Sequence, residues 1–418
     1  MKKILYAIMA AAAVSAIISC EPSTSKVSAI SVNAVIDESA LEDGISADSY
    51  SVTFTNANTG LTVEAESENG IATAEGITPG LYNITASSSM ISGTDNYIIA
   101  GSASNVNLTT DGQEVTIKVT ATKESALVFK EIYYAGCTFS SPSESDPDAT
   151  ATYFRDQFYE IYNNSAETVY VDGMCIAETI FSDYTFTVRY EYPIANPENY
   201  VFVQTVWQIP GDGTKYPVAP GESIIIAQWA TNHKADNLTR GGSPVDLSSA
   251  EFEALEKEST TFDGTVLTDN PAINMVQAVN ARGFSIPQWM TSVSGSRYII
   301  FKPEEAFRTK DFLIANEDPN STALEIPVSE VIDAVEAVSG SERLNFLGLP
   351  ASLNSGAVWL DDPNGYNGQS ISRRISRTED GRNIYQDTNN TSDDFIVNDA
   401  AEIRRNGAGI PSWNTWAN

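Results

Sequence analysis

Residues 155–178 read RDQFYEIYNNSAETVYVDGMCIAE, and this stretch predicts two β-strands joined by a turn. Aromatic and β-branched residues favour strands, and we expect Phe158, Ile161 and Tyr162 to be buried in the first one. The Asn-Asn-Ser sequence that follows is typical of a turn, because asparagine side chains bond neighbouring backbone groups. A second strand, TVYV, then ends at an Asp-Gly turn. The stretch therefore indicates antiparallel β architecture.

The region before this stretch also has the pattern of short strands. YSVTFT and VTIKVT alternate apolar and polar residues, which predicts half-buried antiparallel strands. Asn-Gly and Pro-Gly turns separate shorter strands between them, where Tyr82, Ile84 and Ala86 are expected to point inward. We therefore expect residues 27–122 to form a small β-sandwich of the transthyretin or immunoglobulin type.

A polar segment, ATKES, separates this region from a longer domain, residues 123–418, which is expected to be mainly β with helical insertions. Its predicted strands are LVFKEIYY, QFYEIYNN, ETVYVDG, YTFTVRYEY, ESIIIAQ and SRYIIFK. Two segments instead have apolar residues at helical spacing. They are DLSSAEFEALEKE (246–258), with Asp246 as its N-cap, and PVSEVIDAVEAVSG (327–340), with Ser329 as its N-cap.

The N-terminus has the pattern of a bacterial lipoprotein signal peptide. Two lysines precede the apolar run ILYAIMAAAAVSAII, which ends at Ser19-Cys20. The run is short for a membrane-spanning helix, and lipoprotein signal peptidase requires a small residue before the cysteine. We expect removal of residues 1–19, lipidation of Cys20 and a short tether over 20–26. An ordinary cleaved signal with an incidental cysteine is the alternative.

The chain is strongly acidic, with a formal net charge of −31. Removal of Lys2 and Lys3 with the signal leaves 22 basic residues against 55 acidic ones, a formal charge of −33. Nucleic acid binding depends on Lys and Arg side chains that displace phosphate counterions. We therefore expect no nucleic acid partner, and a membrane association through the lipid alone.

Two cysteines follow the lipidated one, Cys137 and Cys175, both near the ends of predicted strands. An exported location permits a disulfide between them, and two buried thiols are equally consistent with the sequence. Neither spacing matches the CxxC or CxxCH patterns of zinc, iron–sulfur or c-type haem sites. No cofactor is predicted.

The conspicuous polar residues give no pattern of a catalytic site. Glu160 lies in a predicted strand and is expected to pair with backbone or an arginine, while Asp156, Asp172 and Asp387 lie at predicted turns. His233 is the only histidine, and we expect it to be solvated in its loop, so no triad or multi-histidine zinc site is indicated. We expect a protein that is not an enzyme; a hydrolase with carboxylates paired only in space is a third alternative.

Two loops have the composition of ion-binding segments. DDPNGYNG (361–368) is rich in oxygen ligands and could surround calcium, although it lacks the EF-hand order and an ordinary loop also accounts for it. The segment around RISRTEDGR is the one basic cluster and could clamp an anion or pair with local acids. Its arginines are Arg373, Arg374, Arg377 and Arg382.

Two resemblances support the expected fold. NGIATAEGITPGLYNITA resembles the carboxypeptidase regulatory-like modules of exported bacterial proteins, which are usually spacers or docking units. FYEIYN, TVYVDG, VAPGESIIIAQ and the closing SRRISRTEDGRNIYQDTNNTSDDF resemble the lamin-tail type of immunoglobulin-like β-sandwich. That resemblance implies cross-strand pairing of the basic cluster with local acids.

The whole layout is similar to a family of Bacteroidetes lipoproteins, DUF4876. The similarity is carried by VFKEIYYAG, YFRDQFYEIYNNSAETVYVDG and DTNNTSDDF. Lipoproteins of this layout often accompany TonB-dependent outer-membrane receptors, which implies a role in uptake of a nutrient, small ligand or metal chelate. The family supplies no catalytic residues. The mature terminus, CEPSTSK, lacks an acidic export run, so a periplasmic and a surface-facing location both stay open.

The resemblance thus predicts an outer-membrane lipoprotein that is a non-catalytic accessory of a TonB-dependent transporter. A structural or adhesive surface protein that binds glycan or protein is the alternative. In either case the binding surface is expected in the β-sandwich loops and in exposed aromatic residues, unless these rings belong to the core. The candidate aromatic residues are Trp207, Trp229, Trp289, Trp413 and Trp416.

Overall fold

The computed structural model describes residues 28–417 except 43, 93–94, 180–193, 257–258, 261–263, 282–287, 305–306, 308–312 and 315–321. The signal peptide, Cys20 and the tether lie outside the described residues, and so does the predicted strand YTFTVRYEY. Within the described ranges, no helix has the length and apolarity needed to cross a membrane. Strands dominate, as the sequence predicts.

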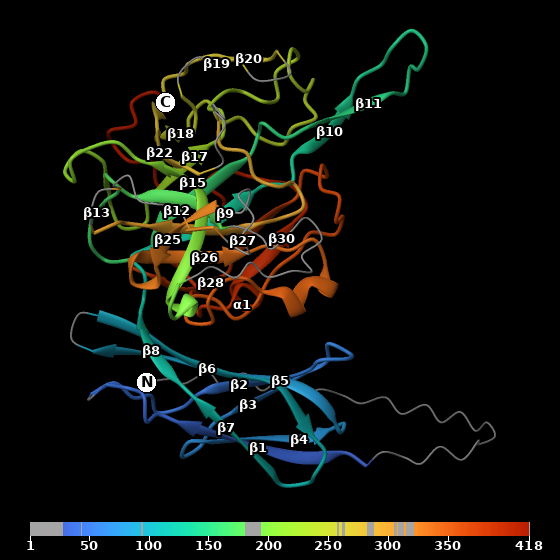
Figure 1. Cartoon of the computed structure of the whole chain (residues 1–418), viewed down its shortest axis with the longest axis vertical. Coiled ribbons are helices and arrows are strands. Elements are labelled where there is room, and N and C mark those ends of the chain that lie inside the picture. The colour runs from blue at the N-terminus through green and yellow to red at the C-terminus, as the bar shows by residue number, and fades with distance from the viewer. Residues whose placement is uncertain are drawn as a thin grey trace, which may run out of the picture. The chain divides into compact units, whose positions relative to one another are not determined.

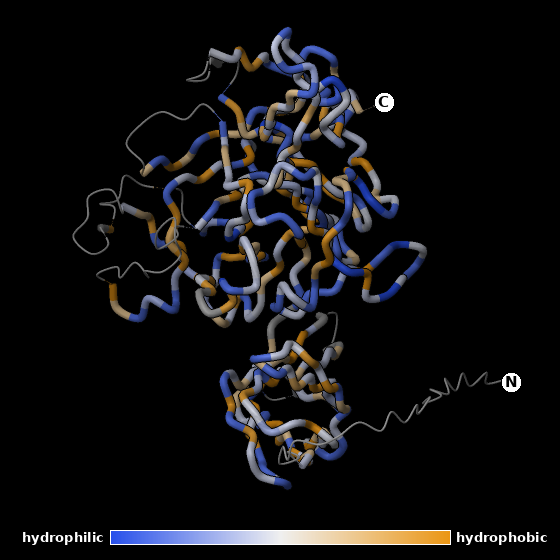
Figure 2. Tube along the Cα trace, turned by 90° about the vertical axis from the view of Figure 1, so that its right-hand side faces the viewer, coloured by the Kyte–Doolittle hydropathy of each residue, from blue (hydrophilic) through white to orange (hydrophobic). Residues whose placement is uncertain are grey.

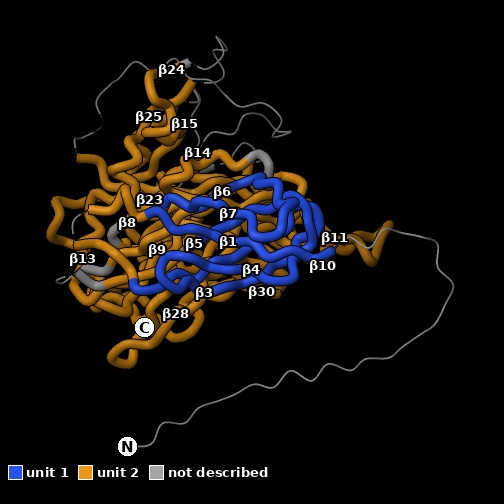
Figure 3. Tube along the Cα trace, turned by 90° about the horizontal axis from the view of Figure 1, so that it is seen from below, with its two compact units in different colours: residues 1–37, 48–86, 102–118 blue, residues 38–47, 87–101, 119–418 orange. Residues whose placement is uncertain are grey.

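The chain forms two compact units, coloured separately in Figure 3. The described part of unit 1 comprises residues 28–37, 48–86 and 102–118, and unit 2 comprises 38–47, 87–101 and 119–418. The sequence-based limits of 27–122 and 123–418 stay predictions.

Unit 1 is built from short antiparallel and parallel strand pairs. Its elements are β1 (Ile30–Asp37), β2 (Ser51–Asn56), β3 (Thr62–Glu66), β4 (Ile71–Ile77), β7 (Gln113–Lys118) and parts of β5 (Gly80–Ser92) and β6 (Asp95–Leu108). β1 lies between β4 and β7, and β2 pairs with β3. Val52 and Phe54 are fully buried, as are Ile84 and Ala86, so the predicted alternation is confirmed.

The first sheet of unit 2 contains the first of the two strands predicted within residues 155–178. Its seven strands, in spatial order, are β21 (Ile273–Asn274), β18 (Phe252–Glu253), β17 (Ser223–Ala227), β12 (Phe158–Asn163), β9 (Leu127–Tyr133), β27 (Ser370–Arg373) and β30 (Phe395–Asn398). Phe158, Ile161 and Tyr162 are buried in β12, as predicted. The turn after β12 is held by Asn163, whose amide donates to the carbonyls of Glu167 and Val218.

The second sheet of unit 2 also has seven strands. Along its main path lie β24 (Leu313–Ile314), β25 (Thr322–Pro327), β15 (Tyr200–Gln208), β14 (Cys175–Thr179), β23 (Arg297–Phe301) and β26 (Val331–Glu336), and β22 (Val276–Asn280) pairs with β15. One hydrophobic cluster joins both sheets, for example Ile161 and Ile224 of the first with Ile176 and Trp207 of the second. Shared burial of two sheet faces defines a β-sandwich.

Shorter elements complete unit 2. They are β8 (Thr120–Lys123), which pairs with β6; the pairs β10 (Cys137–Ser140) with β11 (Thr150–Tyr153), β13 (Val169–Tyr170) with β16 (Pro217–Val218), β19 (Ser259–Thr260) with β20 (Val266–Leu267) and β28 (Ile375–Glu379) with β29 (Arg382–Tyr385); the helix α1 (Thr391–Asp394); and 3₁₀ turns at Pro197–Asn199, Val328–Glu330 and Ser341–Phe346. The β10–β11 hairpin projects from the rest of unit 2 in Figure 1, and Figure 2 shows hydrophobic and hydrophilic residues alternating along the chain.

Both predicted helices are wrong. Residues 331–336 form β26, because β-branched residues suit a strand and the pairing with β23 buries Val335 in the core between the sheets. In 246–258, Asp246 caps only a turn, where its carboxylate accepts from Ser248. The chain then enters β18, which pairs in parallel with β17. Tertiary pairing thus overrides the apparent helical spacing in both segments.

Candidate functional site

Two buried glutamates lie directly opposite each other in adjacent strands of the first sheet. Glu131 in β9 pairs in register with Glu160 in β12, and neither is exposed. Glu160 accepts hydrogen bonds from Lys130 Nζ at 2.8 Å and Ser223 Oγ at 2.7 Å, and Glu131 accepts from Arg405 Nε at 2.8 Å. Like charges facing each other would repel, so each carboxylate needs its own cation. These groups are structural ion pairs.

The C-terminal segment, residues 399–417, supplies further partners. The backbone N–H of Arg404 donates to Glu160 at 3.0 Å, which confirms the predicted pairing of Glu160 with backbone. The Arg404 side chain contacts a third buried carboxylate, Glu251, at 2.5 Å, and Glu251 also accepts from the N–H of Ile225 at 2.8 Å. Burial raises the pKa of both Glu131 and Glu251, against the opposing charges of Arg405 and Arg404. The C-terminal segment is therefore part of the sheet's charge balance.

Arg373 in β27 is the centre of a second cluster, which we call the Arg373 clasp. Its guanidinium contacts Asp333 at 2.6 Å, Asp387 at 3.0 Å and Asp394 at 3.4 Å, and all four side chains are buried. The ring of Phe395 packs against the guanidinium, 4.8 Å from its Cζ atom. The end of the SISR sequence (370–373) and the DTNNTSDDF sequence (387–395) thus meet in one cluster, together with an aspartate from β26.

The Arg373 clasp has three carboxylates and one cation, so it has an excess of acid. Burial raises the pKa of Asp333 to about 7 and that of Asp394 to about 6, although the Arg373 charge opposes both shifts. Asp387 adds a second negative charge near each of them. The clasp therefore takes up protons close to neutral pH.

A third buried cluster surrounds Asp156, just before β12. Its carboxylate accepts from Tyr133 at 2.9 Å and Ser243 Oγ at 2.7 Å, and the Cys137 thiol also bonds to it. Burial raises the pKa of Asp156 to about 6. The same burial, together with the Asp156 charge, raises the pKa of Cys137 far above its ordinary value. A neutral, buried thiol is a poor nucleophile, so this cluster does not activate a cysteine.

His233 lies next to this cluster and is fully buried, so its predicted solvation is wrong. Its Nδ1 is 2.9 Å from the Tyr153 hydroxyl and its Nε2 is 2.9 Å from the Trp229 carbonyl oxygen. Burial lowers the pKa of His233 to about 4, so the ring is neutral at pH 7. Both ring nitrogens are occupied by structural partners, which leaves neither for a nucleophile or a metal.

The prediction that local turn chemistry explains the three aspartates is wrong for Asp156 and Asp387, which are partners in long-range clusters. Asp172 accepts from the backbone N–H groups of Lys215 and Tyr216, at 2.8 Å in the second case, and so joins two distant segments. Sequence offers no signal for these partners, because they are 14 to 87 residues away.

The two cysteines considered for a disulfide are both buried free thiols. Cys137 begins β10, and Cys175 begins β14 in the second sheet. The Cys175 thiol donates to the Gly173 carbonyl oxygen at 3.6 Å, and burial raises its pKa well above the ordinary value.

The arginines of the basic cluster pair with acidic side chains and backbone carbonyls close to them. Arg377 contacts Glu379 at 2.5 Å, and Arg382 contacts Glu379 at 3.5 Å and donates to the Asn164 carbonyl at 2.9 Å. With Arg373 held in its clasp, local pairing accounts for most of the cluster. The pairing with local acids implied by the lamin-tail resemblance is confirmed.

The tryptophans expected as an exposed binding surface are mostly core residues. Trp207, Trp229 and Trp289 are buried, so the prediction of exposure is wrong for them. Trp413 and Trp416 are half-buried and donate to the carbonyls of Pro217 and Ala250. Trp359, which was not among the predicted aromatic residues, is 37% exposed.

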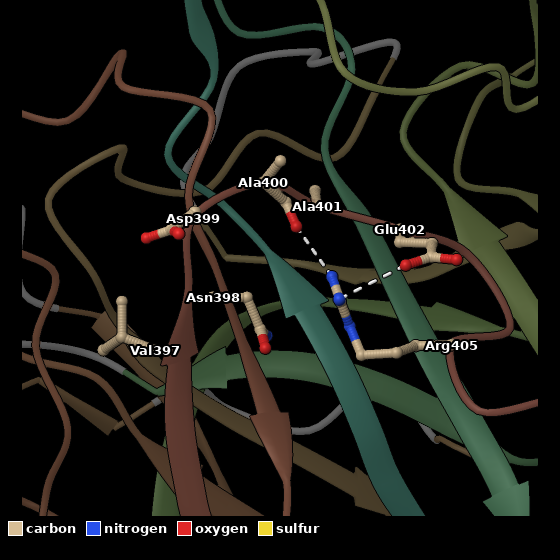
Figure 4. A pocket seen from close by; sticks show the side chains of 7 residues that line it. All are labelled: Val397, Asn398, Asp399, Ala400, Ala401, Glu402 and Arg405. Carbon is tan, nitrogen blue, oxygen red and sulfur yellow. Dashed lines mark hydrogen bonds and ion pairs between the residues drawn. The ribbon is translucent and has the colours of Figure 1, made fainter.

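Two open grooves lie at the C-terminal end of β30 in the first sheet. The larger, about 610 Å³, is lined by Val397, Asn398, Asp399, Ala400, Ala401, Glu402 and Arg405, and Figure 4 shows Arg405 directed toward Ala400 and Glu402. The smaller, about 430 Å³, is lined by Asp361, Asp362, Pro363, Asn367, Gln369 and Asp399. Asp399 belongs to both. We call the two together the Asp399 groove.

The loop considered for calcium forms one wall of the Asp399 groove. Its oxygen atoms are occupied by neighbours: Gln369 Nε2 donates to Asp361 at 2.7 Å, and the backbone and side-chain amides of Asn364 donate to Asp362. Among the described residues, no group of three or more His, Cys, Asp or Glu side chains is arranged to hold a metal ion. The Asp399 groove is acidic and open, whereas the three charge clusters described above are buried.

A two-sheet β-sandwich hosts many different functions, so the architecture alone assigns no chemistry. The chain matches the model of DUF4876, described as a protein of unknown function, over residues 219–401. It also matches the crystal structure of a DUF4876 family protein from Bacteroides thetaiotaomicron with 35% identity and a TM-score of 0.61, covering 92% of this chain and 99% of that one. The chain belongs to the DUF4876 family.

A second solved structure, a candidate adhesin from Bacteroides ovatus, is 10% identical with a TM-score of 0.20, over 73% of this chain and 84% of that one. At that score it supports no argument about fold or function. None of the curated proteins matches the chain.

Proposed function

We propose that this protein is a lipid-anchored, non-catalytic accessory of a TonB-dependent transporter at the outer membrane, which docks on the receptor or captures its ligand. The lipoprotein signal ending at Cys20 and the family membership support this location and class. A metal chelate or another small nutrient is the cargo class that the family resemblance implies.

The observation that carries the proposal is the contrast between closed and open polar groups in unit 2. Buried carboxylates such as Glu160 and Asp333 are held by lysine or arginine partners, whereas Asp399 is exposed in the Asp399 groove. Catalysis by acid, base or nucleophile needs such groups free beside a substrate site. An open acidic groove instead suits recognition of a cationic partner.

Affinity purification tests the proposal. The tagged, lipidated full-length protein is isolated from outer membranes, co-purifying proteins are identified by mass spectrometry, and bound metal is measured by elemental analysis. Recovery of a TonB-dependent receptor, with more receptor than from a matched strain in which Cys20→Ala blocks lipidation, is the expected result. Purification of the protein alone and free of metal contradicts the accessory role.

Trp359 favours a second candidate function, an adhesive surface protein that binds glycan. An exposed aromatic ring beside polar loops is a common platform for a sugar face, and Trp359 is two residues before Asp361 in the groove wall. A glycan array probed with the wild type and with Trp359→Ala tests this. Binding that the substitution removes supports adhesion, and no binding to any glycan excludes it.

A further inference from the structure

β30 is the last strand of the first sheet, and its register determines which backbone groups face outward. Because the Arg374 N–H donates to the Asp394 carbonyl at 2.7 Å, the hydrogen-bonded pairs of this antiparallel ladder continue as Ser372–Ile396 and Ser370–Asn398. The alternate residue, Val397, therefore turns its N–H and C=O away from β27. Neither group has a hydrogen-bond partner among the described residues.

This edge has little of the protection that natural sheets place on exposed strands. Its sequence, FIVN, contains no lysine or proline, and Ile396 is 37% exposed. Free edges of this kind accept an extended segment of another chain as an added strand. The strand is short, so backbone pairing alone gives little affinity and side-chain contacts must contribute.

The Asp399 groove begins at the C-terminal end of this strand and supplies those contacts. Asp399 follows β30 directly, and Asp361 and Asp362 line the smaller opening with it. Glu402 lies farther away, beside Glu131 of β9, to which its N–H donates at 2.9 Å. The single basic group in the lining, Arg405, pairs with Glu131 at 2.8 Å and with Glu402 at 3.3 Å. The groove is therefore net negative, and a bound segment must carry positive charge to be attracted.

We propose that β30 accepts an extended, lysine- or arginine-containing segment of a partner protein as an eighth strand of the first sheet. The segment pairs with the Val397 backbone, and its basic side chains lie against Asp399. A second copy of this chain is disfavoured as the occupant, because its formal charge of −31 opposes a contact at an acidic groove. This inference rests on the proposed docking function and names the chemistry of the docked segment.

The test uses the purified protein and defined peptides. The probe is an acetylated octapeptide in which lysine alternates with valine or threonine, and the control has glutamate in place of lysine. We expect at least ~10-fold tighter binding of the lysine peptide at low salt, with the difference decreasing as salt screens the charges. Equal affinity for both peptides, or no binding of either, overturns the proposal.

Two further comparisons separate strand addition from simple charge attraction. Of two lysine peptides N-methylated on alternate amides, only the one whose methyl groups face away from β30 should bind, because one edge of the peptide pairs. Equal binding of both methylated peptides contradicts strand addition. Val397→Pro, which removes an outward N–H at a tolerated edge position, should abolish binding without loss of folding, as judged by circular dichroism.

The charge contribution is tested by Asp399→Asn, which should weaken the binding of the lysine peptide about fivefold. The control is Asp148→Asn, an exposed acid in the β10–β11 loop, which should leave its affinity unchanged. Equal effects of the two variants contradict a specific role for the groove. These tests contain no membrane receptor, so failure of strand addition is distinguishable from absence of a receptor in the purification.

Discussion

The Arg373 clasp and the Asp399 groove lie along the same part of the first sheet, and both are rich in aspartate. In the clasp, three carboxylates surround one buried guanidinium and bring together β26, β27 and the segment before β30. In the groove, the carboxylate of Asp399 is exposed at the end of β30, whose outer edge is unpaired among the described strands. The difference teaches that acidic composition alone does not indicate function: burial and pairing assign one cluster to stability and the other to recognition.

Arg373→Met is expected to have the largest effect on the free energy of unfolding. The substitution leaves three buried carboxylates without their cation, and we expect a loss of about 3–5 kcal/mol in the free energy of unfolding. Urea unfolding of unit 2 followed by tryptophan fluorescence measures it. Arg374→Met, at the exposed neighbouring position, is the matched control and should change stability by less than about 0.5 kcal/mol. A similar loss in both variants would refute the structural role of the clasp.

Arg405→Met should have an intermediate effect. Glu131 loses its cation but keeps the Ser370 hydroxyl and the Glu402 N–H, so we expect a loss of about 1–3 kcal/mol. The double substitution Arg405→Met with Glu131→Leu removes both charges and should recover part of that loss. If the double variant is no more stable than the single one, burial of unpaired Glu131 is not the cause.

The clasp should also make stability depend on pH. The pKa of Asp333 is about 7 in the folded protein, above its value in an unfolded chain, and that of Asp394 is shifted in the same direction. The folded state then binds protons more tightly, so the free energy of unfolding rises as pH falls from above 7 toward about 4. Asp333→Asn, with a permanently neutral side chain, should reduce this dependence, which urea unfolding at pH 8 and pH 5.5 detects. If the pH dependence of the free energy of unfolding is unchanged in Asp333→Asn, the Arg373 clasp is not its source.

The smallest effect on stability is expected in the groove. Asp399→Asn should change the free energy of unfolding by less than about 0.5 kcal/mol, because the side chain is exposed. Binding of the lysine peptide should nevertheless weaken. A destabilisation comparable with that of Arg405→Met would place Asp399 among the structural groups and remove the contrast between the two clusters.

The sequence predicted the parts of the fold that depend on local pattern. Alternation located the strand around Phe54, aromatic and β-branched residues located the one around Ile161, and the Asn-Asn-Ser turn followed from side-chain chemistry. The same local reasoning failed for 327–340, where Asp333 is buried because Arg373, forty residues later, neutralises it. Apolar spacing cannot show such a partner, so a strand with a buried charge resembled an amphipathic helix.

The candidate site was predictable only in part. The resemblance correctly implied that the basic cluster pairs with acids, and the oxygen-rich DDPNGYNG loop does line a groove. The burial of His233 and the free backbone at Val397 depend on packing and on strand order, which no local pattern records. Strand order also determines which of several acidic segments lies beside an open edge.

Residue-resolved amide hydrogen exchange, measured by NMR for the protein alone and with the lysine octapeptide, tests the central claim most directly. The Val397 N–H faces away from β27, whereas the adjacent Ile396 N–H is bonded within the ladder and acts as an internal control. We predict fast exchange at Val397 in the free protein, slow exchange at Ile396 in both states, and protection of Val397 when the peptide binds. Protection of Val397 already in the free protein, or none in the complex, would contradict β30 as a docking edge.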